Sequence, residues 1–469
     1  MREQVLAASA TRQARLIREK RISSVELVES HLKQIAAVNP HINAAVGILA
    51  DEALRAARAA DQTLARGEAV GPLHGVPFSV KDSIEVAGAV CTAGTVGRRC
   101  ALPAAHDATV VARLRRAGAI PIARTNLPDL LFAFESDNLL FGATRNPYDP
   151  ARTSGGSSGG EAALIAACGS PLGLGSDCAG SVRVPSAFCG IAGIKPTSGR
   201  LPRTGHFPPA GGWIEALWQI GPMSRSVEDL RTVLPLLSGS DGQDFGAVSV
   251  PCPDTLETDL RQLRVAWYTD NGIAAADADV SRVVRAAATV LTAAAAAVEE
   301  SLPACLQHAY DLEMKLIGAD GGDSLRVALK SMGSARAHPL LLSWVEKLEP
   351  YRTTLAGFQS YWEEWDSFRA EMSSFARDYD AILCPVYTHA ALPHATSTQS
   401  DNFLGFSHTM AYNLAGWPAA VVRCGEDGAG LPIGVQVVSR PWREDVALAV
   451  AGLLEEALGG WKAPKLPNP

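Results

Sequence analysis

The chain has 469 residues, of which 47% are hydrophobic and 19% are charged, and its formal net charge at pH 7 is −7. This composition supplies enough apolar side chains for a large buried core and excludes an intrinsically disordered protein. The acidic balance, and a sequence without a basic stripe interleaved with aromatic residues, argue against a nucleic-acid partner. We therefore expect a soluble globular protein.

The N-terminal part of the chain predicts helices that alternate with short apolar strands. Residues 4–37 show helical periodicity, and Ser23 with Glu26 gives the pattern of a capping box inside them. Residues 51–66 predict a second helix, and residues 110–127 predict a helix followed by a strand. Such alternation indicates a layered α/β core.

A lysine follows the next apolar run. Residues 76–80 predict a strand, which would carry Lys81 into the interior at its end. Burial removes hydration from the ammonium group and can lower the pKa of a lysine by several units, which leaves a neutral amine. Lys81 is therefore a candidate base.

Residues 153–197 contain two serine sites among glycines. Glycines surround Ser157 and Ser158, and Ser181 follows the sequence Asp-Cys-Ala-Gly at residues 177–180. Glycine permits backbone conformations that are closed to other residues and leaves amides free to point at a ligand. Because a serine hydroxyl is a poor nucleophile at neutral pH, it needs a nearby base, and two such sites suggest cooperating hydroxyls.

Lys81, the block of residues 155–160 and Ser181 together resemble the amidase signature family, which are hydrolases with a Ser-Ser-Lys triad. Further motifs of this family occur at residues 91–95, 124–128, 135–138, 145–147, 195–197, 410–420 and 430–436. The resemblance covers roughly two-thirds of the chain, and several ordered motifs at fitting separations are far more specific than one short pattern.

The resemblance implies a role for each member of the triad. Ser181 would be the nucleophile, Ser157 the bridging serine and Lys81 the base, with a cis peptide between Gly156 and Ser157. The substrate carbonyl would form an acyl-enzyme with Ser181, which water then hydrolyses. Neither a metal ion nor an organic cofactor is expected to take part.

The resemblance also assigns supporting residues around Ser181. The oxyanion hole would consist of the backbone N–H groups of Cys178, Ala179, Gly180 and Ser181. Asp177 and Arg183 are expected to hold this loop by hydrogen bonds and an ion pair, with Gly156 and Ser158 as further supporting residues. A catalytic thiol at Cys178 is a weaker alternative to a small side chain that fills space behind the loop.

Two departures from the family pattern bear on substrate choice, and one glutamate bears on the branch of the family. Ser154 stands where many relatives have proline, and Ala179 stands where glycine is common, which is expected to affect substrate choice more than mechanism. The resemblance adds that a glutamate such as Glu161 is found in the branch with fatty-acid amide hydrolases, whereas amidotransferase subunits usually have serine. Glu161 could also serve only to start a helix over residues 161–167.

The substrate pocket is expected to come from two stretches. Residues 208–219 form a loop with Trp213 and Trp218, which could line an apolar pocket or be ordinary core. Residues 246–378 contain no motif of the family and are rich in aromatic side chains. We predict that this segment covers the active site and shapes the pocket, with plain helical core as the alternative.

The second half of the chain continues the α/β pattern. Residues 263–268 predict a strand, residues 278–300 an alanine-rich helix, residues 308–378 a long helical region and residues 379–386 a buried strand. With the resemblance, this predicts one domain over residues 1–469, an amidase signature α/β/α sandwich with a mixed twisted sheet. Its core would span about residues 70–240 and 379–460, with a variable region at about 246–378.

Two rival functions remain open. Residues 155–159 satisfy the pattern G-x-S-x-G of the α/β-hydrolase nucleophile elbow, which would pair with His389, His394 or His408, but residues 148–154 are a poor strand to lead into it. A glutamine-amidotransferase subunit would need partner chains. The main prediction is hydrolysis of aryl or alkyl amides, with carbamates (a urethanase) and esters as subsidiary substrates, all of them small molecules.

The cysteines and the apolar runs predict the compartment. The nine cysteines are odd in number and scattered without metal-ligand spacing, which favours reducing cytoplasm and argues against a metal site. Residues 1–21 lack the apolar stretch of a signal peptide, and residues 286–298 are too short to span a bilayer. We expect a cytoplasmic monomer or homodimer without a membrane segment.

Overall fold

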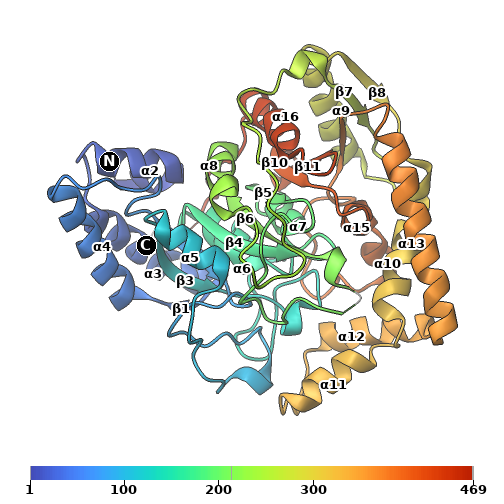
Figure 1. Cartoon of the computed structure of the whole chain (residues 1–469), viewed down its shortest axis with the longest axis horizontal. Helices are drawn as coiled ribbons and strands as arrows, with labels where there is room; N and C mark the ends of the chain where they lie inside the picture. Colours follow the sequence, from blue (N-terminus) through green and yellow to red (C-terminus); the bar gives the residue numbers. More distant parts are fainter. Residues whose placement is uncertain (1, 213, 467–469) are drawn as a thin grey trace.

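The computed structural model describes residues 2–212 and 214–466. Within these residues one mixed sheet of eleven strands runs through the molecule, with helices on both of its faces (Figure 1). The strands are β1 (Ala45–Ile48), β2 (Pro77–Lys81), β3 (Ile120–Thr125), β4 (Leu172–Asp177), β5 (Ala192–Lys195), β6 (Gln219–Ser224), β7 (Arg264–Trp267), β8 (Ala297–Glu300), β9 (Ala381–Pro385), β10 (Ala419–Glu426) and β11 (Pro432–Ser439). The predicted α/β/α sandwich is confirmed.

The helices cover the sheet in two layers. They are α1 (Arg2–Ala7), α2 (Ala10–Arg18), α3 (Ser24–Ile42), α4 (Ala50–Ala65), α5 (Thr109–Arg116), α6 (Gly159–Ala166), α7 (Arg183–Phe188), α8 (Val227–Leu237), α9 (Ala278–Thr292), α10 (Ala309–Gly318), α11 (Asp323–Ser331), α12 (Pro339–Leu348), α13 (Leu355–Phe375), α14 (Ser400–Leu404), α15 (Ser407–Leu414) and α16 (Glu444–Leu458). Helices α2, α5, α8, α9 and α16 bury apolar side chains against one face. Helices α4, α6, α7, α10 and α15 pack on the other.

The strand order is β1-β3-β2-β4-β6-β5-β10-β11-β9-β7-β8. Strand β2 pairs in parallel with β3 and β4, and β7 pairs in parallel with β8 and β9. Strand β10 pairs antiparallel with β5 and β11. Because β2 lies inside the sheet between two parallel neighbours, both of its faces are covered, which explains why the whole strand is buried.

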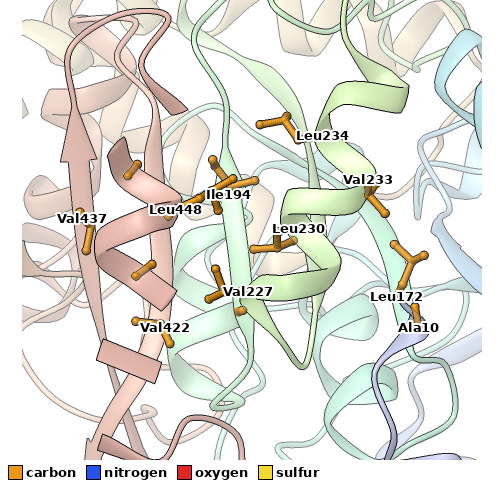
Figure 2. Packing of buried hydrophobic residues seen from close by; sticks show 14 of the residues in the cluster. Ala10, Leu172, Ile194, Val227, Leu230, Val233, Leu234, Val422, Val437 and Leu448 are labelled. Carbon is orange, nitrogen blue, oxygen red and sulfur yellow. The ribbon is translucent and has the colours of Figure 1, made fainter. Parts of the chain in front are cut away.

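Strand β10 shows how the two layers divide the core. Ala420 and Val422 belong to the cluster under α8 and α16, whereas Ala419 and Val421 belong to the cluster on the other face. This is the two-residue alternation expected of a strand. Figure 2 shows Leu230 of α8 close to the strand side chains of the first cluster, with α8 and α16 side by side above the sheet.

Most predicted elements are present, and one prediction is wrong. The capping box of Ser23 and Glu26 starts α3 as predicted. The alanine-rich helix does not continue over residues 278–300: α9 ends at Thr292, and residues 297–300 form β8. The backbone of β8 pairs with β7 at the edge of the sheet, and this tertiary pairing overrides the helical preference of the alanines before it.

Both predicted core stretches give strands to the same sheet, from β2 near the start to β11 near the end. We therefore propose that the chain forms a single domain. Among the described helices, none has the length and hydrophobicity needed to cross a lipid bilayer. The cytoplasmic location and the monomeric or dimeric state stay predictions.

Candidate active site

Lys81 is the last residue of β2 and is fully buried. Its Nζ lies 2.7 Å from Ser157 Oγ, 3.0 Å from Ser176 Oγ and 3.4 Å from the Ser176 carbonyl oxygen. Burial lowers the pKa of Lys81 to about 7, against the attraction of the Asp177 and Glu161 carboxylates, which raises it. The side chain can therefore exist as a neutral amine near physiological pH.

Ser157 lies on a tight loop whose preceding peptide, Gly156–Ser157, is cis. A Cβ on Gly156 would lie 2.6 Å from the backbone nitrogen of Glu135, so only glycine fits there. Ser136 holds the loop, because its hydroxyl donates to the carbonyl of Gly155 at 3.1 Å and accepts a hydrogen bond from the amide of Gly159. The loop thus fixes the Ser157 hydroxyl against Lys81.

Ser158 joins the two serine segments. Its amide donates to the Ser181 carbonyl at 3.1 Å, and its hydroxyl donates to the Ser176 carbonyl at 3.2 Å. The exposed fraction is 0% for Lys81, 1% for Ser157 and 8% for Ser181. Of these three side chains, Lys81 is therefore the most deeply buried and Ser181 is the most accessible to a ligand.

The loop before Ser181 is held by one carboxylate. Asp177 accepts the amides of Gly180 at 2.9 Å and Val182 at 3.0 Å. The resemblance assigned the Gly180 amide to the oxyanion hole, but this amide already donates to Asp177 and is not free to bind a ligand. In the described part of the chain, the amides of Cys178, Ala179 and Ser181 donate to no protein acceptor, which leaves them available to a ligand.

Asp177 and Arg183 form a buried ion pair. Arg183 donates to Asp177 through Nε at 3.0 Å and through Nη2 at 2.9 Å, and both side chains are fully buried. Burial alone would raise the pKa of Asp177, but the guanidinium and the amide of Asn413 hold it well below its usual range. Arg183 also donates to the carbonyl of Thr409 at 2.9 Å, which ties the loop to α15.

Glu161 lies behind Lys81, in the first turn of α6, and is fully buried. Its carboxylate accepts from the hydroxyls of Ser79 and Thr125, the latter at 2.7 Å. Burial raises the pKa of Glu161 to about 8, although these hydrogen bonds and Lys81 lower it. Since Ser79 and Lys81 share one face of β2, Glu161 is a neighbour of the base and does more than start a helix.

A cavity of about 120 Å³ opens onto Ser157 and Ser181. Its other walls come from residues 130–134, from residues 176–179, from Ile317 and Trp344, and from six residues of one loop: His206, Pro208, Pro209, Gly211, Ile214 and Trp218. Trp218 is one of the lining residues, whereas Trp213 lies outside the described residues. Among the described lining residues, the only acidic or basic side chain apart from His206 is Asp177, which is paired, so the cavity is apolar.

The rival catalytic groups are not in this cavity. Its described lining residues do not include His389, His394 or His408. Residues 148–154, all of them described, form only isolated bridges and no strand, so the elbow of an α/β-hydrolase is not formed. Burial raises the pKa of the Cys178 thiol well above its usual value, which disfavours a thiolate nucleophile.

Two polar residues of the site were not predicted from the sequence. Ser176 contacts Lys81, and His206 lies 3.0 Å from Ser176 Oγ and lines the cavity. His206 stands just before the loop of residues 208–219, but nothing in the local sequence distinguishes it from a surface histidine. Across residues 2–212 and 214–466, no group of three or more His, Cys, Asp or Glu side chains is arranged to hold a metal ion.

Comparison with known proteins gives the family. The chain matches the protein family described as Amidase over residues 26–448. It is 32% identical to the Homo sapiens protein named Fatty-acid amide hydrolase 2, over 98% of this chain and 91% of that protein. It is 34% identical to a subunit of the Glutamyl-tRNA(Gln) amidotransferase of Anaeromyxobacter dehalogenans (strain 2CP-C), with 96% of each chain covered.

A solved structure gives the same result for the fold. The structure of 6-aminohexanoate cyclic dimer hydrolase complexed with substrate superposes with a TM-score of 0.88 at 28% identity and covers 99% of this chain and 100% of that one. The family predicted from the motifs is confirmed by both kinds of comparison. The chain therefore belongs to the amidase signature family and is a hydrolase of carbon–nitrogen bonds.

Proposed function

We propose that the chain hydrolyses uncharged carboxylic amides, with Ser181 as nucleophile, Ser157 as bridging serine and Lys81 as base. The observation that carries this proposal is the 2.7 Å contact between Lys81 Nζ and Ser157 Oγ in a buried site that opens, through Ser181, onto an apolar cavity. A lysine with a pKa of about 7 is neutral in a large fraction of molecules at pH 7 to 8 and can accept a proton.

We propose the following reaction for these residues. Lys81 takes the proton of Ser157 as Ser157 takes that of Ser181, and Ser181 Oγ bonds to the substrate carbonyl carbon. The free amides of Cys178 and Ala179 donate to the oxyanion, together with the amide of Ser181 itself. The carbon–nitrogen bond then breaks while the relay returns its proton to the leaving amine. Water, deprotonated by the same relay, attacks the acyl-enzyme and releases the acid.

The cavity narrows the substrate class. Apolar cavities of about 150 Å³ bind benzene, and the cavity here, at about 120 Å³, is close to that size, so we propose that it takes an aryl or a branched alkyl group. Phe132, Phe134 and Trp344 supply aromatic walls, which favour flat rings. We therefore place anilides and aryl amides first and long-chain acyl amides last. Carbamates and esters present a similar carbonyl and are proposed as secondary substrates.

The amidotransferase relatives supply the second candidate, supported by the 34% identity over 96% of the chain. A protein with this role would release ammonia from glutamine for partner chains. Against this role, the cavity beside Ser181 has no unpaired charged side chain among its described residues that could bind the α-amino and α-carboxylate groups of glutamine.

The test is hydrolysis by the purified single chain of a panel with one benzoyl group and varied leaving groups: anilide, alkyl amide, primary amide, carbamate and ester. A second series varies the acyl chain, and glutamine is included. Ser181→Ala is expected to abolish turnover. Ser186→Ala, a buried serine on α7 whose hydroxyl donates to the Val182 carbonyl, is the matched control and should remain active. Turnover that survives in Ser181→Ala would overturn the nucleophile, and glutaminase activity alone would favour the second candidate.

A further inference from the structure

The contacts of Lys81 limit the directions in which its lone pair can point. A neutral amine has two N–H bonds and one lone pair. The carbonyl oxygen of Ser176, 3.4 Å away, can only accept, so one N–H of Lys81 points towards it. The second N–H has two hydroxyls within reach, Ser176 Oγ at 3.0 Å and Ser157 Oγ at 2.7 Å. Productive catalysis needs that N–H to point to Ser176, because the lone pair must face Ser157.

His206 determines which way the Ser176 hydroxyl points. Its Nδ1 lies 2.9 Å from the carbonyl oxygen of Pro208, which can only accept, so Nδ1 carries the hydrogen. Burial lowers the pKa of His206 to about 3, so the ring is neutral and Nε2 has a free lone pair. That lone pair faces Ser176 Oγ at 3.0 Å and Ser83 Oγ at 3.1 Å.

The hydrogen bonds therefore form an ordered chain. The Ser176 hydroxyl donates to Nε2 of His206, and its oxygen then accepts from Lys81. With both N–H bonds directed at Ser176, the lone pair of Lys81 is left for the proton of Ser157. Without an acceptor at Nε2, the Ser176 hydroxyl could turn and donate to that lone pair, in competition with Ser157.

We infer that His206 is a positioning residue that orients the proton relay: through Ser176 it keeps the lone pair of Lys81 directed at Ser157. This inference rests on the proposed function. It also links the cavity wall to the base, because the histidine bonds to Pro208 and its ring lies 4.5 Å from that of Trp218, and all three line the cavity. A substrate that presses on this wall acts on the base through one side chain.

The charged surroundings stay the same when His206 is changed. The titratable groups that act on Lys81 and His206 are Glu161 of α6, Asp177 at the end of β4, Cys178 directly after it, and Arg203 on the same loop as the histidine. Arg203 is held by Asp244 at 2.9 Å. In the described structure the imidazole ring of His206 is hydrogen-bonded to none of these side chains, so replacing the ring leaves their pairing intact.

The test compares His206→Leu, which removes the acceptor, with His206→Gln, whose amide oxygen can take the place of Nε2. In His206→Leu we expect kcat to fall roughly tenfold, the effect of losing one oriented hydrogen bond, with KM unchanged. The acid limb of the pH profile should move to lower pH, because a hydrogen bond donated to the neutral amine favours that form and lowers the pKa of Lys81. His206→Gln should restore most of kcat.

Two further variants separate this role from a loss of folding. Ser83→Ala removes the other hydroxyl at Nε2 and should keep the wild-type kcat and pH profile, because the Ser83 hydroxyl bonds to the histidine and not to the base. Ser176→Ala should be slow, and adding His206→Leu to it should cause little further loss, because both changes break one chain. Thermal unfolding of each variant checks that it is folded.

The reaction with an alkyl fluorophosphonate gives a readout that does not depend on the substrate. Ser181 Oγ bonds to phosphorus, fluoride leaves and the proton passes to Lys81, so the rate of inactivation against pH reports the relay. If His206→Leu keeps the wild-type rate and acid limb, or Ser83→Ala is as slow as His206→Leu, the inference is wrong. If Lys81→Ala reacts as fast as the wild type, the proposed triad itself is wrong. Failure of the inference about His206 and failure of the proposed function therefore give different results.

Discussion

The pH dependence of activity is the most direct test of the buried base. Lys81 must be neutral to accept a proton, and burial lowers its pKa from 10.5 to about 7. At pH 8 the neutral fraction is then about 90%, against about 0.3% for an ordinary lysine, so burial contributes about 300-fold in rate at that pH. Activity is lost as pH falls through 7, because the amine becomes protonated.

The assay is kcat/KM for an anilide between pH 5 and 10. We expect a plateau above about pH 8 and a fall of about tenfold per unit below about pH 6.5. Lys81→Arg keeps a long cation in place but cannot lose its proton, so it should be inactive over the whole range. A wild-type profile that keeps rising to pH 10 would show a lysine of ordinary pKa, and the reasoning from burial would be refuted.

Three further predictions concern stability and the serine loop. The pKa of Lys81 is lower in the folded state than in the unfolded chain, so the charged form disfavours folding. Lys81→Met should therefore raise the free energy of unfolding at pH 7 by up to about 4 kcal/mol, measured by urea denaturation. This difference between variant and wild type should disappear as the pH approaches 10.5. Arg183→Met leaves Asp177 buried without its partner and should lower the free energy of unfolding by about 3–5 kcal/mol, measured by urea denaturation. Gly156→Ala places a Cβ 2.6 Å from a backbone nitrogen and should abolish activity, whereas Gly428→Ala, with nothing within 4 Å of the added carbon, should behave like the wild type; an active Gly156→Ala would contradict the fit of this loop.

The parts of the site that lie within short motifs could be predicted from the sequence. Lys81 ends an apolar run, and glycines flank Ser157, so both positions can be found from local patterns alone. The layered fold was also predictable, since alternating helices and strands leave few arrangements open. The structure brings Lys81 and Ser157 within 2.7 Å of each other, although 76 residues separate them.

The remaining features depend on contacts that no local pattern encodes. His206 reaches Ser176 across 30 residues, and its tautomer depends on one carbonyl in a loop. The Gly180 amide is turned to Asp177 by the geometry of the loop. Residues 297–300 form a strand because their backbone pairs with β7 at the edge of the sheet. Each of these outcomes was decided by tertiary packing, which overrides local propensity.

The two sides of the cavity have separate origins in the chain. Ser157, Ser181 and the loop that holds them belong to the stretch with family motifs, whereas Ile317 and Trp344 come from α10 and α12, within the stretch of residues 246–378 that we predict to be variable (Figure 1). Exchange of these helices between relatives would therefore alter which compound is accepted while leaving the reacting groups untouched. A library that randomises Ile317 and Trp344 is a practical starting point for redirecting the enzyme to new amides.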